Sequence, residues 1–168
     1  TKNISTAHWY IIAPPFSIRE NHEGKDLNRL FKEDDPPTEV YFVRSIFNTP
    51  FELTIELHED NESIGYYLYQ KGVDAKDDEL GYEILAAIKN IMPINLDNEI
   101  DGHSANRGIV GKDIDFSTMD WWPMALYGLS KGVTRSLTLE TASHFDMKTR
   151  VNSHLTAIKT AINYFSNK

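Results

Sequence analysis

Residues 51–60 read Phe-Glu-Leu-Thr-Ile-Glu-Leu-His-Glu-Asp, with apolar and polar side chains in alternation. Successive side chains of an extended strand point to opposite faces, and an alternation of this kind is typical of a strand with one apolar face. The apolar face consists of Leu53, Ile55 and Leu57, and the other face of Thr54, Glu56 and His58. The stretch therefore predicts a β-strand that ends at a histidine flanked by acids.

Further strands and helices are predicted on both sides of this strand. Strands are expected at 8–13, 51–58, 64–70 and 133–140, and helices at 39–48, after Thr38 as a cap, at 79–92 and at about 146–166. The last helix carries an apolar stripe of Val151, Leu155, Ile158, Ile162 and Phe165. Residues 16–38 are predicted to form a long loop, and residues 93–132 to be mostly irregular. Strands that alternate with helices favour an α/β layered fold.

The composition restricts the classes of partner and chemistry. The 168 residues include 17 Lys and Arg against 25 Asp and Glu, a formal net charge of −8, and 40% are hydrophobic. This is typical of one globular domain, and the acidity argues against binding to nucleic acid or to an anionic membrane. The chain has no cysteine, which excludes disulfides, thiolate metal ligands and cysteine nucleophiles. No apolar run reaches the length of a membrane span.

Two arginines lie ten residues apart in the predicted loop. The segment reads Arg19-x-Asn21-x-x-Gly24-x-Asp26-Leu-Asn-Arg29-x-Phe31. Guanidinium groups pair bidentately with carboxylates and stabilise oxyanions, so this loop is a candidate anion site. The alternative interpretation is a solvated, salt-bridged loop, which composition alone favours.

His58 and Glu140 each end a predicted strand, where sites gather in open α/β sheets. Imidazole is a common metal ligand, and a carboxylate can act as a general base toward a metal-bound water. Taken separately, a hydrogen-bonded edge histidine and a capping carboxylate are the more common roles.

Together, three segments resemble the zinc carboxypeptidase (metallocarboxypeptidase) superfamily over about residues 8–166. They are the arginine loop, residues 51–60 with the following Gly-Tyr-Tyr-Leu-Tyr at 65–69, and residues 136–141 with the terminal helix that carries Arg150 and His154. The resemblance implies a three-layer α/β/α fold with a mixed sheet and one bound zinc ion.

The resemblance also implies residue roles. His58 would be a zinc ligand, and Asn28 and Arg29 would hold the terminal carboxylate of the substrate. Arg19 would polarise the scissile carbonyl, and Glu140 would deprotonate the attacking water and protonate the leaving amine. Tyr127 is a candidate for the family's mobile substrate tyrosine, and Trp121 and Trp122 could line a pocket. Packing beneath a long loop is the favoured alternative for these three aromatic residues.

The sequence departs from the family at the metal. The family uses a His-x-x-Glu ahead of the arginine loop, and this chain has none. A catalytic zinc needs three protein ligands, so His58 alone should hold it weakly. The start at Thr1 favours a chain that corresponds to the C-terminal portion of a single catalytic domain; a metal-poor relative is the other interpretation. Ala142 also replaces a proline that often follows Glu-Thr in related bacterial proteins.

The expected function is zinc-dependent hydrolysis of an amide next to a free carboxylate, as in a peptide C-terminus. An amidohydrolase of N-acyl amino acids, as in the aspartoacylase and succinylglutamate desuccinylase branch, is the first alternative. A carboxylate-binding domain without metal or activity is the second.

Overall fold

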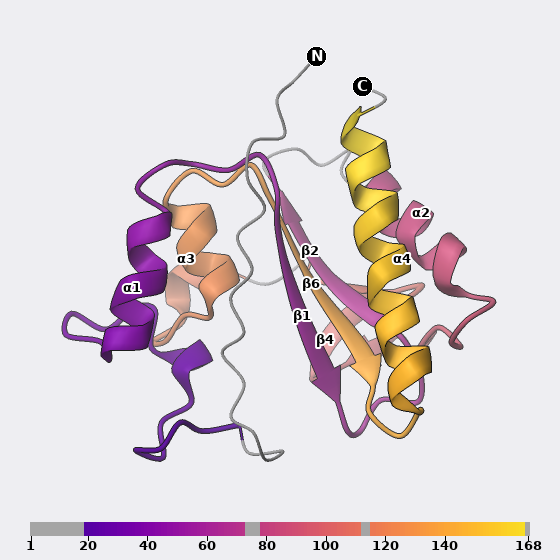
Figure 1. The fold of residues 1–168 in the computed structure, drawn as a ribbon, viewed down its shortest axis with the longest axis horizontal. Helices are drawn as coiled ribbons and strands as arrows, with labels where there is room; N and C mark the ends of the chain where they lie inside the picture. Colours follow the sequence, from indigo (N-terminus) through magenta and orange to yellow (C-terminus); the bar gives the residue numbers. More distant parts are fainter. Residues whose placement is uncertain (1–18, 73–77, 112–114, 167–168) are drawn as a thin grey trace.

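The computed structural model describes residues 19–72, 78–111 and 115–166 (Figure 1). The strand predicted at 8–13 lies outside these residues. Six strands form one mixed sheet in the order β1-β6-β2-β5-β4-β3. They are β1 (Thr54–Asp60), β2 (Tyr67–Gly72), β3 (Glu99–Ile100), β4 (His103–Asn106), β5 (Ile109–Val110) and β6 (Arg135–Ala142). Strand β6 pairs in parallel with β1 and antiparallel with β2, and β1 is an edge strand.

Helices cover both faces of the sheet, as the predicted α/β layering requires (Figure 1). Helices α1 (Thr38–Ile46) and α3 (Met124–Ser130) lie on one side, and α2 (Asp78–Ile88) and α4 (Met147–Ser166) on the other. Two short 3-10 helices, η1 (Leu27–Arg29) and η2 (Phe116–Thr118), complete the described elements. No helix in the described part of the chain is both long and apolar enough to cross a membrane.

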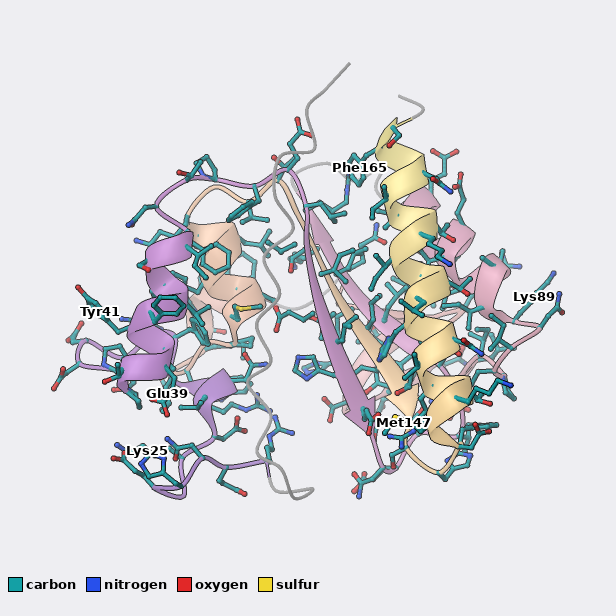
Figure 2. All side chains as sticks on the ribbon, viewed as in Figure 1. Lys25, Glu39, Tyr41, Lys89, Met147 and Phe165 are labelled. Atoms are coloured by element: carbon teal, nitrogen blue, oxygen red, sulfur yellow. The ribbon has the colours of Figure 1, made fainter. Side chains whose placement is uncertain are left out.

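Each helical layer has its own core. On the side of α2 and α4, Leu68, Ile84, Leu137 and Leu139 are buried together. On the side of α1 and α3, the core is formed by Phe31, Val40, Val43, Phe47 and Val133. Figure 2 shows Tyr41 on the side of α1 turned away from the sheet, consistent with its exposure. The second core fixes the loop that carries η1 against the sheet.

The structure corrects the predicted apolar stripe of α4. Val151, Leu155 and Ile162 are between 42% and 45% exposed, whereas Ser153, Ala157 and Ala161 are buried. Small side chains let this helix approach α2 and the sheet closely, so close packing rather than side-chain size decides which face is inside.

The segment 93–132, predicted to be mostly irregular, contains β3, β4, β5, η2 and α3. The strands are two to four residues long, and β4 (His-Ser-Ala-Asn) is mostly polar, so no periodicity marks them. Helix α1 begins at Thr38 with Pro37 as its N-cap, and no side chain caps it.

Gly65 is required where the chain enters β2. A Cβ atom there would lie 2.5 Å from the Pro93 carbonyl oxygen and 3.0 Å from the Asn95 nitrogen, both backbone atoms. We expect Gly65→Ala to lower the free energy of unfolding by about 2–3 kcal/mol, because backbone atoms on both sides must move. Urea unfolding measures the change.

Gly24→Ala is the matched control. Gly24 has a φ of +72° but no atom within 4 Å of an added Cβ, so the strain alone should cost about 1 kcal/mol. Equal decreases in the free energy of unfolding of the two variants would contradict the close approach of the Pro93 and Asn95 backbone to Gly65.

Candidate active site

One cavity of about 560 Å³ is lined by residues of η1, α3 and the sheet. Helix α3 lies on the side of the sheet opposite α2 and α4 (Figure 1). The cavity walls come from the η1 loop, the carboxyl ends of β1 and β6, strand β2, and the segment 95–126. Five residues singled out in the sequence line it: Arg19, Asn28, Arg29, His58 and Glu140. The fold thus brings together segments more than 100 residues apart.

His58 and Glu140 are register partners on the parallel strands β1 and β6. Both side chains line the cavity, and Glu56, two residues before His58, lines it as well. The Nε2 atom of His58 lies 3.4 Å from a carboxylate oxygen of Glu56. An acid, an imidazole and a second acid therefore share one face of two adjacent strands.

Burial and charge shift the pKa values of this group. Burial raises the pKa of Glu140 to about 7, with further contributions from Asp60, Asp101 and Glu56, although His58 opposes the shift. Burial opposes ionisation of His58, but the hydrogen bond to Glu56 and the charge of Glu140 outweigh it, so its pKa is raised. Glu140 can thus exchange a proton near neutral pH.

Two tyrosines, the buried Tyr67 and the half-buried Tyr69, fix carboxylates around Glu140. The Tyr67 hydroxyl donates to Asp60 at 2.9 Å, and the Tyr69 hydroxyl donates to Asp101 at 2.7 Å. Tyr67 is the register partner of Glu140 on β2. Burial, followed by the charge of Glu140, raises the pKa of Tyr67, which keeps the phenol protonated as a donor.

The cationic side of the cavity is built on η1. Asp26 caps this helix by accepting from the Asn28 backbone N–H at 3.1 Å, and it pairs with Arg19 and, at 3.9 Å, with Arg29. The Arg29 guanidinium carbon lies 4.2 Å from the centroid of the Trp121 ring. Burial and the neighbouring Arg19 lower the pKa of Arg29, so a bound anion would relieve repulsion between the two cations.

Asn28 joins this loop to α3. Its Oδ1 atom accepts a hydrogen bond from the backbone N–H of Met124 at 2.8 Å. Because the amide oxygen is used in this way, the side-chain NH₂ is the group that Asn28 can offer to a ligand carboxylate.

Tyr127 does not line the cavity. Its ring packs against Phe31 and Phe47, each at a centroid distance of 5.8 Å, which is the packing role that the sequence favoured. Trp121 lines the cavity beneath Arg29, and the Trp122 indole donates to the Phe116 carbonyl at 3.1 Å.

His154 supports the carboxyl end of β1 from the opposite layer. Burial lowers its pKa to about 4, so its ring is neutral near neutral pH. A carbonyl only accepts, so Nε2–H donates to the His58 backbone oxygen at 3.1 Å, and Nδ1 accepts from the Tyr66 hydroxyl at 3.3 Å. Arg150 forms an ion pair with Glu59 next to it. These contacts fix the backbone that carries His58.

Comparison with solved structures identifies the fold. The chain resembles proteins from Shewanella amazonensis (TM-score 0.70, 15% identity), Shewanella denitrificans (0.71, 17%) and Shewanella baltica (0.70, 17%), all provisionally named metallopeptidases. The chain has the fold of these three proteins. In each case 86% of this chain is covered, but it spans only 54–56% of the length of those structures. No protein-family model and no curated protein sequence matches.

The described residues do not complete a metal site. Residues 19–72, 78–111 and 115–166 hold no group of three His, Asp or Glu side chains placed to bind one ion. Among the described residues, His58 is the imidazole in register with Glu140, and its Nε2 faces Glu56. A catalytic zinc with three protein ligands therefore does not fit these residues alone.

Of the eight acids that line the cavity, the sequence assigns a role only to Glu140, and three others, Glu56, Asp60 and Asp101, act on its pKa. Glu56 was placed on the polar face of its strand but treated as a flanking acid, although its spacing of two residues from His58 was the available signal. Asp60 and Asp101 accept hydrogen bonds from Tyr67 and Tyr69. Asp60, Tyr67 and Tyr69 lie in segments that the sequence singled out, but no local pattern predicts these pairings.

The raised pKa of Glu140 predicts a pH dependence of stability. Between its ordinary pKa of 4.5 and about 7, native Glu140 retains a proton that the unfolded chain has lost. This contribution to stability is present in full below about pH 4.5 and is lost as pH rises through about 7, and the raised pKa of His58 acts in the same direction. We expect a contribution of about 1–3 kcal/mol between pH 5 and 8.

Glu140→Gln should remove most of this contribution. Urea unfolding of both proteins at pH 5, 6, 7 and 8, in the presence of a chelator, should show the variant gaining stability relative to the native protein as pH rises. A difference that is constant across these pH values would contradict the assignment.

Proposed function

We propose that this chain carries the carboxylate-binding and proton-transfer residues of a metal-dependent exopeptidase, which cleaves the amide bond next to a free carboxylate. One observation supports the proposal: a single cavity is lined by Arg19, Asn28 and Arg29, and also by His58 and Glu140. The metallopeptidase-like fold is consistent with it.

The residues divide the reaction between them. Arg29 and the Asn28 amide hold the substrate carboxylate by charge-assisted hydrogen bonds. Arg19 is exposed and forms an ion pair only with Asp26 among the described residues, so it can turn toward the carbonyl oxygen of the scissile amide and stabilise the oxyanion. Glu140 accepts a proton from the attacking water and donates it to the leaving amine, for which a pKa of about 7 suits both steps.

The metal requires ligands beyond His58. A zinc ion, the proposed metal, would supply Lewis-acid chemistry at the scissile carbonyl and the water. Among the described strands β1 lies at the edge of the sheet, so a further segment of the protein can lie beside His58 and provide the other ligands. Under this proposal the 168 residues are the C-terminal portion of one catalytic domain.

We expect the 168-residue chain alone to bind zinc weakly and to hydrolyse little. One imidazole with carboxylate neighbours should give a dissociation constant in the micromolar range or weaker, which titration calorimetry measures. One tightly held zinc per chain after dialysis would show that the missing ligands lie within these residues.

The proposed activity is tested with the full-length gene product. We expect removal of the C-terminal residue from a free-acid peptide, with little activity on the corresponding C-terminal amide and little on N-acetylaspartate or N-succinylglutamate. Preferred hydrolysis of the N-acyl amino acids would assign the protein to the amidohydrolase alternative. Binding of these carboxylates with no hydrolysis in any metal would indicate a binding domain.

A further inference from the structure

We infer that the cavity selects a terminal residue whose side chain ends in an ammonium group, as in lysine or ornithine, and that Glu56 is the residue that recognises it. The inference rests on the proposed function, because it names the substrate class of the same site.

Glu56 has a buried carboxylate, and one of its two oxygens has no hydrogen-bond partner. Its side chain is 5% exposed, and it lines the cavity. One oxygen lies 3.4 Å from His58, and the other, Oε1, has no hydrogen-bond partner. A buried polar atom without a partner is costly and rare in folded proteins, so a ligand donor at this position would be stabilised strongly.

A second unpartnered acceptor lies in the same part of the cavity. The Ser136 hydroxyl oxygen on β6 is buried without a hydrogen-bond partner, and Ser136 also lines the cavity. Glu56 is the register partner of Thr138, two residues from Ser136 on the same face of β6. An ammonium group has three N–H donors and can serve the carboxylate and the hydroxyl together.

Glu56 lies further from the carboxyl ends of the strands than His58 and Glu140 do. His58 and Glu140 form the register pair nearest the carboxyl ends of their strands, and the pair of Glu56 and Thr138 is two residues further from those ends. The cavity is also lined by one lysine, Lys71. It donates to the Gly111 carbonyl at 3.3 Å and lies over the Phe116 ring. A substrate side chain that extends along the sheet away from these ends would meet Glu56.

The charge of the whole cavity favours the same ligand. Eight of its lining residues are Asp or Glu, and three are Arg or Lys. The arginines are gathered on the η1 loop, so one end of the cavity attracts a carboxylate while the remainder attracts a cation. A terminal residue with both groups complements this distribution.

The test compares two peptides that differ only in the last residue, lysine or norleucine, with the full-length gene product. The two side chains differ by the ammonium group against a methyl group. We expect kcat/KM to be about 10–100-fold higher for the lysine peptide. Glu56→Gln should reduce this ratio to about 3-fold or less, whatever its effect on the rate itself.

Glu62→Gln is the matched control, because Glu62 lines the cavity but is exposed. This variant removes the same charge and should keep the preference for the lysine peptide over the norleucine peptide. Ser136→Ala should lower the preference without changing any charge, and it serves if Glu56→Gln does not fold.

The outcomes separate this inference from the proposed function. Hydrolysis of both peptides at similar rates, or a preference that survives Glu56→Gln, overturns the role of Glu56 and leaves the exopeptidase standing. If neither peptide is cleaved, the exopeptidase fails, and calorimetry with free lysine and norleucine still decides the inference: tighter binding of lysine, lost in Glu56→Gln, supports it, and equal affinities overturn it.

Discussion

Glu140→Gln in the full-length protein is expected to lower kcat by about 10²–10⁴-fold while substrate affinity changes by less than about 3-fold. Glutamine keeps the size and the buried position of the side chain but accepts no proton. Because Glu140 has a pKa of about 7, it is the group of the cavity best placed to take a proton from water and return it to an amine. Initial rates give kcat, and calorimetry on the inactive variant gives the affinity.

Glu99→Gln is the control for a lost charge. Glu99 lines the same cavity but is exposed on β3, so its loss should leave kcat within about 2-fold. Near-normal turnover in Glu140→Gln would remove Glu140 from the proton-transfer role and would leave the carboxylate-binding role of the arginines intact.

Arg29→Gln is expected to lower kcat/KM by about 10²–10³-fold for a peptide with a free terminal carboxylate. For the same peptide with a terminal amide, kcat/KM should fall little, because this peptide offers no anion to Arg29. The ratio of the two values therefore falls in the variant, and this ratio isolates carboxylate recognition from general damage to the site.

Arg107→Gln controls for the loss of a stacked arginine. The Arg107 guanidinium lies 5.8 Å from the Tyr82 ring centroid but does not line the cavity. It should leave the ratio of acid to amide substrates unchanged. An unchanged ratio in Arg29→Gln would show that another group binds the carboxylate.

Much of the fold could be predicted from the sequence because its long elements have a clear period. The alternation at 51–58 is found as β1, and the predicted strand at 133–140 is found as β6, although its bounds are shifted by two residues. The strand at 64–70 begins later, at Tyr67, because Tyr66 first bridges to Ile94 in another segment. Such strand boundaries depend on contacts between distant segments, and a local sequence pattern does not predict these contacts.

The short elements could not be predicted from local patterns. Strands of two residues have no period, and α3 is only seven residues long. The buried face of α4 was also mispredicted, since Ala157 and Ala161 are buried by close packing while larger apolar residues stay exposed.

The site was easier to predict than the segment around it. A resemblance in three segments allowed five site residues to be predicted, and the structure places all five in one cavity: Arg19, Asn28, Arg29, His58 and Glu140. Their roles stay predictions. Glu56 was not assigned, although the alternation of the strand already placed it beside His58. The unpartnered oxygen that makes it a candidate is visible only when β6 lies next to β1.

The central position of β6 has a consequence for synthesis on the ribosome. Strand β6 lies between β1 and β2, yet it begins 75 residues after β1 ends, at Arg135 against Asp60. At about 5–20 residues per second, β1 waits about 4–15 s for the strand with which it pairs. During that interval the described strand that pairs with β1 has not been made, so chaperones that bind extended segments should engage the nascent protein at β1 until β6 emerges.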